Sequence, residues 1–172
     1  MESSSLAQQI KAAFPLLPLP EVSLHQAQLL DQTMSRELTE AEWEAAGAQD
    51  SGRTWQAFTE DELIACDSAL CHLDECGFIY YLPAFLVFAL RHLEVEWNHP
   101  ARATTGSAVF AVTDRSGYSL SRFARFTPEQ VAAVTAFLNA VAQSSGRNAQ
   151  DARVALDRYW NTDRAGKFLL LP

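Results

Sequence analysis

The chain has 172 residues, of which 48% are apolar and 20% are charged, and its formal net charge is −8. This composition is typical of one globular domain and excludes a disordered chain, because a domain of this size buries roughly 70% of the surface that its unfolded chain exposes. The charge is uneven: residues 1–76 carry 14 acidic and 3 basic side chains, whereas residues 77–172 carry 7 acidic and 10 basic ones. An acidic half repels nucleic acid and anionic lipid, and it attracts basic proteins.

Helical periodicity begins near the N-terminus. Leu6, Ile10 and Phe14 recur at helical spacing within residues 5–14, and the prolines of PLLPLP then end this helix. Residues 22–34 have the composition of a second helix.

Two capping boxes predict helix starts within the acidic half. Thr39 with Glu42 opens one short helix, and Thr59 with Glu62 opens another. In each pair the Thr hydroxyl accepts a hydrogen bond from the Glu amide, while the carboxylate accepts one from the Thr amide.

The most apolar stretch is GFIYYLPAFLVFAL, residues 77–90. We predict that the helix opened by the second capping box spans 60–76 and that Gly77 ends it. Pro83 then suits the first turn of a central helix over 83–97. The apolar run over 78–90 has 13 residues and falls short of the ~20 that cross a bilayer, so we expect a helix buried among others and no membrane span.

Residues 98–126 allow two interpretations. SAVFAV has the composition of a strand and DRSG suits a turn into YSLSRF, which predicts a small β-hairpin at 107–123. Two short helices fit the same residues.

The remaining sequence predicts two more helices. Thr127 as N-cap and Pro128 at the first helical position open a helix over 128–143, and a last helix follows over about 148–160. We expect the apolar tail, residues 167–172, to pack on the domain. The whole chain, residues 1–172, is thus predicted to be a mainly α, single-domain bundle of about six helices.

Cysteine and histidine side chains form no recognisable metal or nucleophile site. Cys66, Cys71 and Cys76 lie on one predicted helix, where a rotation of about 100° per residue points them in three directions. His72 shares a face with Cys76, but two ligands are too few for structural zinc. No glycine-rich phosphate motif occurs and no pattern links a histidine to a nucleophile. We therefore predict no catalytic residue, no metal and no cofactor, and a non-enzymatic protein is favoured over an enzyme.

Cysteine usage also indicates the compartment. Three cysteines cannot all pair within the chain, and the N-terminal MESSSLAQQIKAAF lacks the apolar core of a signal peptide. We expect free thiols in a reducing cytoplasm.

The segment RSGYSLSRFARF, residues 115–126, interleaves three arginines with three aromatic rings. Base stacking and phosphate contacts need that mixture. Because the segment is short and the chain is acidic, we interpret it as a packed aromatic stripe with solvated arginines and expect no nucleic-acid partner.

Several motifs together resemble one protein family. The motifs are IKAAF at 10–14, Trp55, YYLPAFL at 80–86, FTPEQV at 126–131, Phe137-Leu138 and Tyr159-Trp160. The chain is similar in these residues to an uncharacterised bacterial family with a YLPAFL-like core, whose members are small cytoplasmic proteins of unknown function. The resemblance covers nearly the whole chain, and it implies no catalytic residue, cofactor or substrate.

Two functions from different classes follow from these observations. The acidic half favours an interaction protein with a basic protein partner, and one version is an immunity protein that covers the basic active site of a toxin. The alternative is an enzyme or small-ligand binder with a pocket near Tyr80 and Tyr81, although these rings would equally suit a core in which only their hydroxyls form hydrogen bonds. The candidate interaction or pocket residues are Tyr80, Tyr81, His72, Glu60, Asp61 and Glu62.

Overall fold

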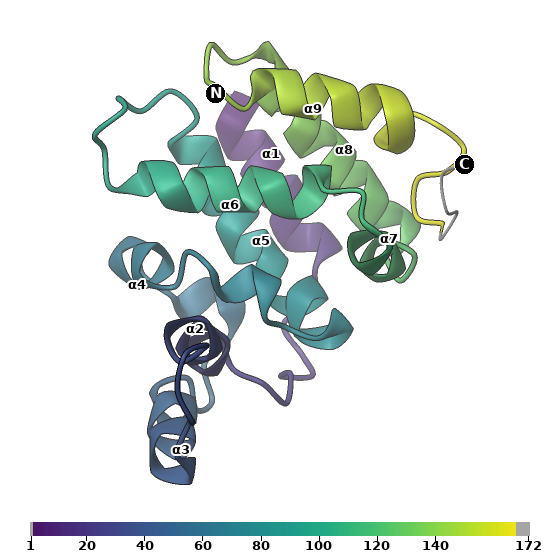
Figure 1. Cartoon of the computed structure of the whole chain (residues 1–172). Helices are drawn as coiled ribbons and strands as arrows, with labels where there is room; N and C mark the ends of the chain where they lie inside the picture. The colour runs from purple at the N-terminus through teal and green to yellow at the C-terminus, as the bar shows by residue number, and fades with distance from the viewer. Residues whose placement is uncertain (1, 168–172) are drawn as a thin grey trace.

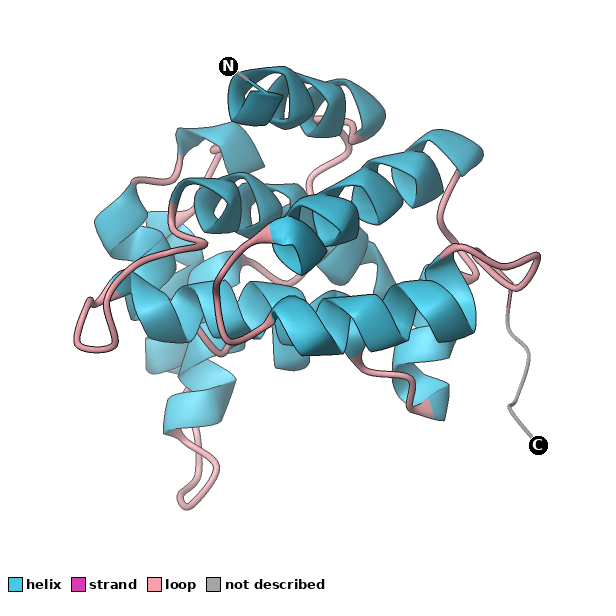
Figure 2. Ribbon diagram, turned by 90° about the horizontal axis from the view of Figure 1, so that it is seen from above, coloured by secondary structure: helices cyan, strands magenta, loops and turns pink. Residues whose placement is uncertain are grey.

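The longest helix, α5 (Glu75–Arg91), runs through the middle of the computed structural model, which describes residues 2–167, with side chains from Ser5 onward (Figure 1). Helices from both halves of the chain pack around it, and seen from above, the described residues contain helices and loops without a strand (Figure 2). The other α-helices are α1 (Glu2–Ala13), α2 (Leu24–Gln32), α3 (Glu40–Gln49), α4 (Glu60–Ala65), α6 (Ala101–Thr113), α7 (Gly117–Phe123), α8 (Pro128–Gln143) and α9 (Ala149–Ala155). Two 3₁₀ turns, η1 (Trp55–Ala57) and η2 (Ala69–Cys71), and a π turn, η3 (Leu156–Trp160), complete this single all-helical domain.

The helix predicted over 60–76 is wrong in its length and in its end. It breaks after Ala65 into turns that include η2, and α5 begins at Glu75. The reason is a stronger local start signal, because the Asp74 carboxylate accepts a hydrogen bond of 2.7 Å from the Gly77 amide. Gly77 therefore lies in the first turn of α5 instead of ending a helix.

The prediction that Pro83 opens the central helix is also wrong. Pro83 lies inside α5, which spans 75–91 where the sequence predicted 83–97. An internal proline removes one backbone hydrogen bond and costs about 3 kcal/mol. Burial offsets this cost, since 13 of the 17 residues of α5 are buried. Within residues 2–167, no helix is both long enough and apolar enough to cross a membrane.

The β-hairpin predicted at 107–123 is wrong, and the alternative of two short helices is right. Residues 101–113 form α6, and residues 117–123 form α7 behind the Ser116 N-cap. SAVFAV continues α6 because Ala108, Val109 and Val112 recur at helical spacing and are buried against the rest of the core.

Helix starts that rest on capping boxes are confirmed. Thr39, Thr59 and Thr127 each exchange both hydrogen bonds with the residue three positions later. The last predicted helix is confirmed as α9 followed by η3. The apolar tail lies outside the described residues beyond Lys167.

One helix stands apart from this packing. Helix α3 lies at the lower end of the molecule and packs mainly on α2 (Figure 1). Of its ten residues only Ala46 is buried. We call α3 the acidic projection.

Candidate functional site

Tyr80 and Tyr81 lie in the core. Both rings are buried on α5 and pack edge to face at a centroid distance of 5.0 Å. The Tyr80 hydroxyl donates to the Leu16 carbonyl over 3.0 Å, and the Tyr81 ring packs edge to face on Phe58. Burial raises the pKa of both phenols above their ordinary value, so both stay neutral. Neither ring lines any of the four cavities described below.

His72 joins two segments of the acidic half. Its Nε2 lies 3.1 Å from a carboxylate oxygen of Asp31 on α2, and His72 itself follows η2. The pair ties the turn before α5 to α2, which is a structural contact.

The three carboxylates at the start of α4 have three different surroundings. Glu60 accepts a hydrogen bond from Arg91 over 2.9 Å and lies 3.2 Å from His92 Nε2. The Glu62 carboxylate accepts hydrogen bonds from both terminal guanidinium nitrogens of Arg53. Asp61 is exposed and forms no ion pair among the described residues.

The Arg53–Glu62 pair should make the free energy of unfolding depend on pH in the acidic range. Hydrogen bonds from Arg53 and from Thr59 lower the pKa of Glu62 from its ordinary 4.5 to about 2. A carboxyl with a lowered folded pKa contributes stability that is fully present above pH 4.5 and is lost as the pH falls toward 2. We expect Glu62→Gln to cost about 1 kcal/mol at neutral pH and much less near pH 2. Urea unfolding at both pH values measures this, and a cost that is equal at both would contradict the assignment.

These six predicted residues do not converge on one cavity. Glu60 lines a small cavity of about 80 Å³ beside Phe88, and the other five line none of the described cavities. The described residues also contain no group of three or more histidine, cysteine or acidic side chains that could hold a metal ion.

A histidine–carboxylate pair that sequence reasoning missed lies between α2 and the end of α3. His25 Nδ1 lies 2.6 Å from Asp50 Oδ1, and the His25 amide donates to the other carboxylate oxygen over 2.8 Å. Cys66 lines the same cavity, of about 290 Å³, as His25. Burial raises the pKa of the Cys66 thiol to about 12, so the thiol stays protonated and unreactive. The pair therefore anchors the acidic projection to α2 and activates no nucleophile.

The acidic projection presents one face to solvent. Ala41, Ala45 and Ala48 lie along it at helical spacing and are exposed, with Glu40 and Glu44 beside them. Neither carboxylate forms an ion pair within the part of the chain that is described. The opposite face rests on α2, where the Gln26 amide donates to the Trp43 carbonyl over 3.1 Å.

Arg122 is buried, which corrects the prediction of solvated arginines in residues 115–126. Its guanidinium donates to the carbonyls of Leu70 and Leu73, and its Cζ lies 3.9 Å from the ring centroid of Tyr118 and 4.5 Å from that of Phe78. Burial lowers its pKa from the ordinary value. Arg122 thus fastens α7 to the turn before α5 by hydrogen bonds and cation–π contacts.

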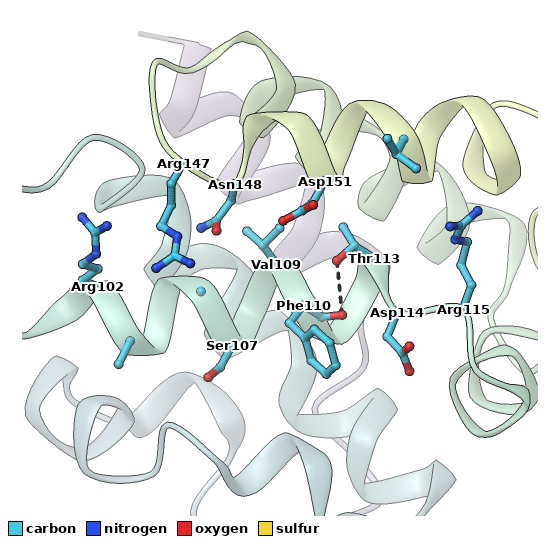
Figure 3. A pocket seen from close by; sticks show the side chains of 13 residues that line it. Arg102, Ser107, Val109, Phe110, Thr113, Asp114, Arg115, Arg147, Asn148 and Asp151 are labelled. Carbon is cyan, nitrogen blue, oxygen red and sulfur yellow. Dashed lines mark hydrogen bonds between the residues drawn. The ribbon is translucent and has the colours of Figure 1, made fainter. Parts of the chain in front are cut away.

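A second feature that the sequence did not reveal is a groove between α6 and α9, which we call the α6–α9 groove. It holds about 1060 Å³, and Figure 3 shows Arg102 and Arg147 at one end and Arg115 at the other. None of these three arginines is ion-paired among residues 5–167. Its lining is Arg102, Ala103, Gly106, Ser107, Val109, Phe110, Thr113, Asp114, Arg115, Arg147, Asn148, Asp151 and Val154.

Comparison with known proteins identifies a family without a known activity. The sequence model described as "Family of unknown function (DUF6714)" matches residues 2–164, which is nearly the whole chain. No curated protein matches the chain significantly. No solved structure does so either.

Proposed function

The chain belongs to the DUF6714 family of unknown function, and from the geometry of this member we propose that it is a non-enzymatic protein-interaction module. The acidic projection binds a basic surface of a partner protein. The observation that carries this proposal is the exposed face of α3, a helix that packs mainly on α2 and presents free carboxylates at Glu40 and Glu44.

Electrostatics support a basic partner. Residues 1–76 carry a net charge of −11, which steers a positively charged protein toward this end and speeds association at low salt. One specific version is an immunity-type inhibitor that covers the basic active site of a toxin. The three free cysteines favour a reducing compartment such as the cytoplasm for this chain.

The alternative function, a small-ligand binder or enzyme with a pocket near Tyr80 and Tyr81, has less support. Both rings are packed in the core, and the Tyr80 hydroxyl already donates a hydrogen bond to the Leu16 carbonyl. A ligand at this position would first have to displace core side chains.

Affinity capture tests the proposal. We expect the wild-type chain to retain a basic protein from a lysate of its own cells at about 0.1 M salt and to release it at about 1 M, where the screening length falls to about 3 Å. Glu40→Arg with Glu44→Arg should lose the partner. A control with the same charge change, Glu21→Arg with Glu37→Arg, alters exposed residues outside α3 and should retain it. Capture of the same protein by the α3 double variant would contradict the proposal.

A further inference from the structure

We propose that the acidic projection of one copy docks into the α6–α9 groove of a second copy. This inference rests on the proposed function, since it names the second copy as one basic partner of the same helix. It joins two features that packing within one chain leaves unexplained: a helix with nine of its ten residues outside the core and a large groove with unpaired arginines.

The groove offers a floor that another helix can approach closely. Ala103, Gly106 and Ser107 recur on one face of α6, and a Cβ placed on Gly106 would meet no atom within 4 Å. Small side chains and glycine let a second backbone come near. Phe110 continues this face as an apolar side chain that the described residues leave 57% exposed.

The projection offers the matching surface. Its exposed stripe of Ala41, Ala45 and Ala48 has side chains as small as those of the groove floor, so the two helices can pack at a short interaxial distance. Glu40 and Glu44 flank the stripe, and the α-carbon positions of such a pair lie about 6 Å apart along the axis, since each residue rises 1.5 Å. Two neighbouring guanidinium groups can therefore receive one carboxylate each.

The lengths also agree. A ten-residue helix such as α3 is about 15 Å long, and the twelve-residue stretch of α6 from Arg102 to Thr113 is about 18 Å long. Arg102 and Arg147, which lie at one end of the groove, then face the acidic first turn of the docked helix (Figure 3). Asn148 lies beside Arg147 and adds a neutral amide donor.

The charge pattern favours a helix over a nucleic-acid strand. Asp114 and Asp151 also line the groove, so its charged side chains sum to only +1. A phosphodiester backbone carries a charge at every nucleotide and needs a continuous track of cations. Separate carboxylates on a helix need only the local pair of arginines. Asp114 accepts hydrogen bonds from the hydroxyls of Ser116 and Ser119, and among the described residues it forms no ion pair with its neighbour Arg115.

The proposed contact joins two different surfaces, so each bound copy can bind a further copy. The projection lies at the lower end of the molecule, while α9 lies at the upper end with α6 between them, so the projection does not reach the groove of its own chain (Figure 1). Each assembly keeps one free projection and one free groove unless a ring closes, which predicts a series of sizes and no single dimer. A basic partner protein on α3 and this contact between copies exclude one another.

Sedimentation velocity with charge-reversed pairs tests the contact. Variant A carries Glu40→Arg and Glu44→Arg, and variant B carries Arg102→Glu and Arg147→Glu. We expect the wild-type chain to show a sedimentation coefficient that rises with concentration at about 0.1 M salt and falls to the monomer value at about 1 M. Each variant alone should stay monomeric at the concentrations where the wild type associates. Their equimolar mixture should associate, because the arginines of A face the glutamates of B and the original charges of each remain complementary.

A matched control keeps the net charge change of variant B. Arg158→Glu with Lys167→Glu alters two exposed residues outside the groove and should associate as the wild type does. Far-UV circular dichroism confirms that each variant is folded. A monomeric wild type at every concentration, an unchanged variant B, or a mixture of A and B that stays monomeric would each overturn the proposed contact. If the chain stays monomeric yet captures a basic protein through α3, the contact between copies is wrong and the proposed function stands.

Discussion

Replacing Arg122 with methionine is expected to lower the free energy of unfolding by about 3 kcal/mol. The change keeps much of the volume between Phe78 and Tyr118 but removes every donor. The buried Leu70 carbonyl then has no side-chain donor, and the two cation–π contacts are lost. Part of this loss is offset because a buried charge no longer has to be desolvated. Urea unfolding monitored by circular dichroism measures the change.

Arg125 provides the matched control for this substitution. It lies three residues away, is exposed, and pairs with Glu75 over 2.9 Å. An exposed ion pair contributes between about 0 and 1 kcal/mol, so Arg125→Met should cost little. Lysine at position 122 should fall between methionine and the wild type, because one ammonium cannot reproduce the fork of the guanidinium. Equal stabilities of the two methionine variants would show that Arg122 does not fasten α7 to the turn before α5.

Replacing Phe85 with aspartate should prevent folding. The ring is fully buried at the centre of α5, and its loss together with an unpaired buried carboxylate costs more than about 5 kcal/mol. Since a domain of this kind is stable by only about 5–15 kcal/mol, we expect an insoluble or unfolded protein. Leu86→Asp, at a position that is equally buried, should behave in the same way.

Two further variants make this prediction measurable. Phe85→Leu removes part of the ring, should stay folded and should lose about 1–2 kcal/mol in urea unfolding. Met34→Asp makes the same kind of change at a side chain that is 77% exposed, so it should alter stability by no more than about 0.5 kcal/mol. A soluble, cooperatively folded Phe85→Asp protein would show that α5 is not the centre of the core.

The sequence predicted helix starts well where the signal is local. A capping box needs only two residues three positions apart, and the boxes at Thr39, Thr59 and Thr127 all formed. The burial of the apolar run at 78–90 was predictable for a similar reason, since no helix can leave such a run exposed to water.

Local signals failed where packing against distant residues decides whether a proline starts a helix or lies inside one, and whether a segment is a helix or a strand. Pro83 ordinarily marks a helix start, but burial of α5 on all sides outweighs the one lost hydrogen bond. Asp74 could have revealed the true start, because aspartate is a preferred N-cap residue whose carboxylate accepts a hydrogen bond from the amide three positions later, here that of Gly77. In the same way the β-branched residues of α6 indicated a strand, yet their spacing also fits the buried face of a helix.

Sites built by distant segments lay beyond sequence reasoning. The α6–α9 groove combines Arg102 with Arg147, which are separated in the chain by the rest of α6 and by all of α7 and α8. Arg122 looks like any exposed arginine in RSGYSLSRFARF until the carbonyls of Leu70 and Leu73 are brought against it. The acidic character of the first half was visible, but the projection of α3, which carries Glu40 and Glu44, away from the rest of the fold was not.

Hydrogen exchange of the chain with its captured basic partner tests the central proposal most directly. The measurement is made at a concentration where the chain alone is monomeric, with and without partner. Binding to the acidic projection predicts slower exchange of the amides of Glu40–Gln49 in the complex, with α6, α9 and the part of α5 around Tyr80 and Tyr81 unchanged. Unchanged exchange in α3, with new protection around Tyr80 and Tyr81, would contradict the proposal and favour a ligand pocket there.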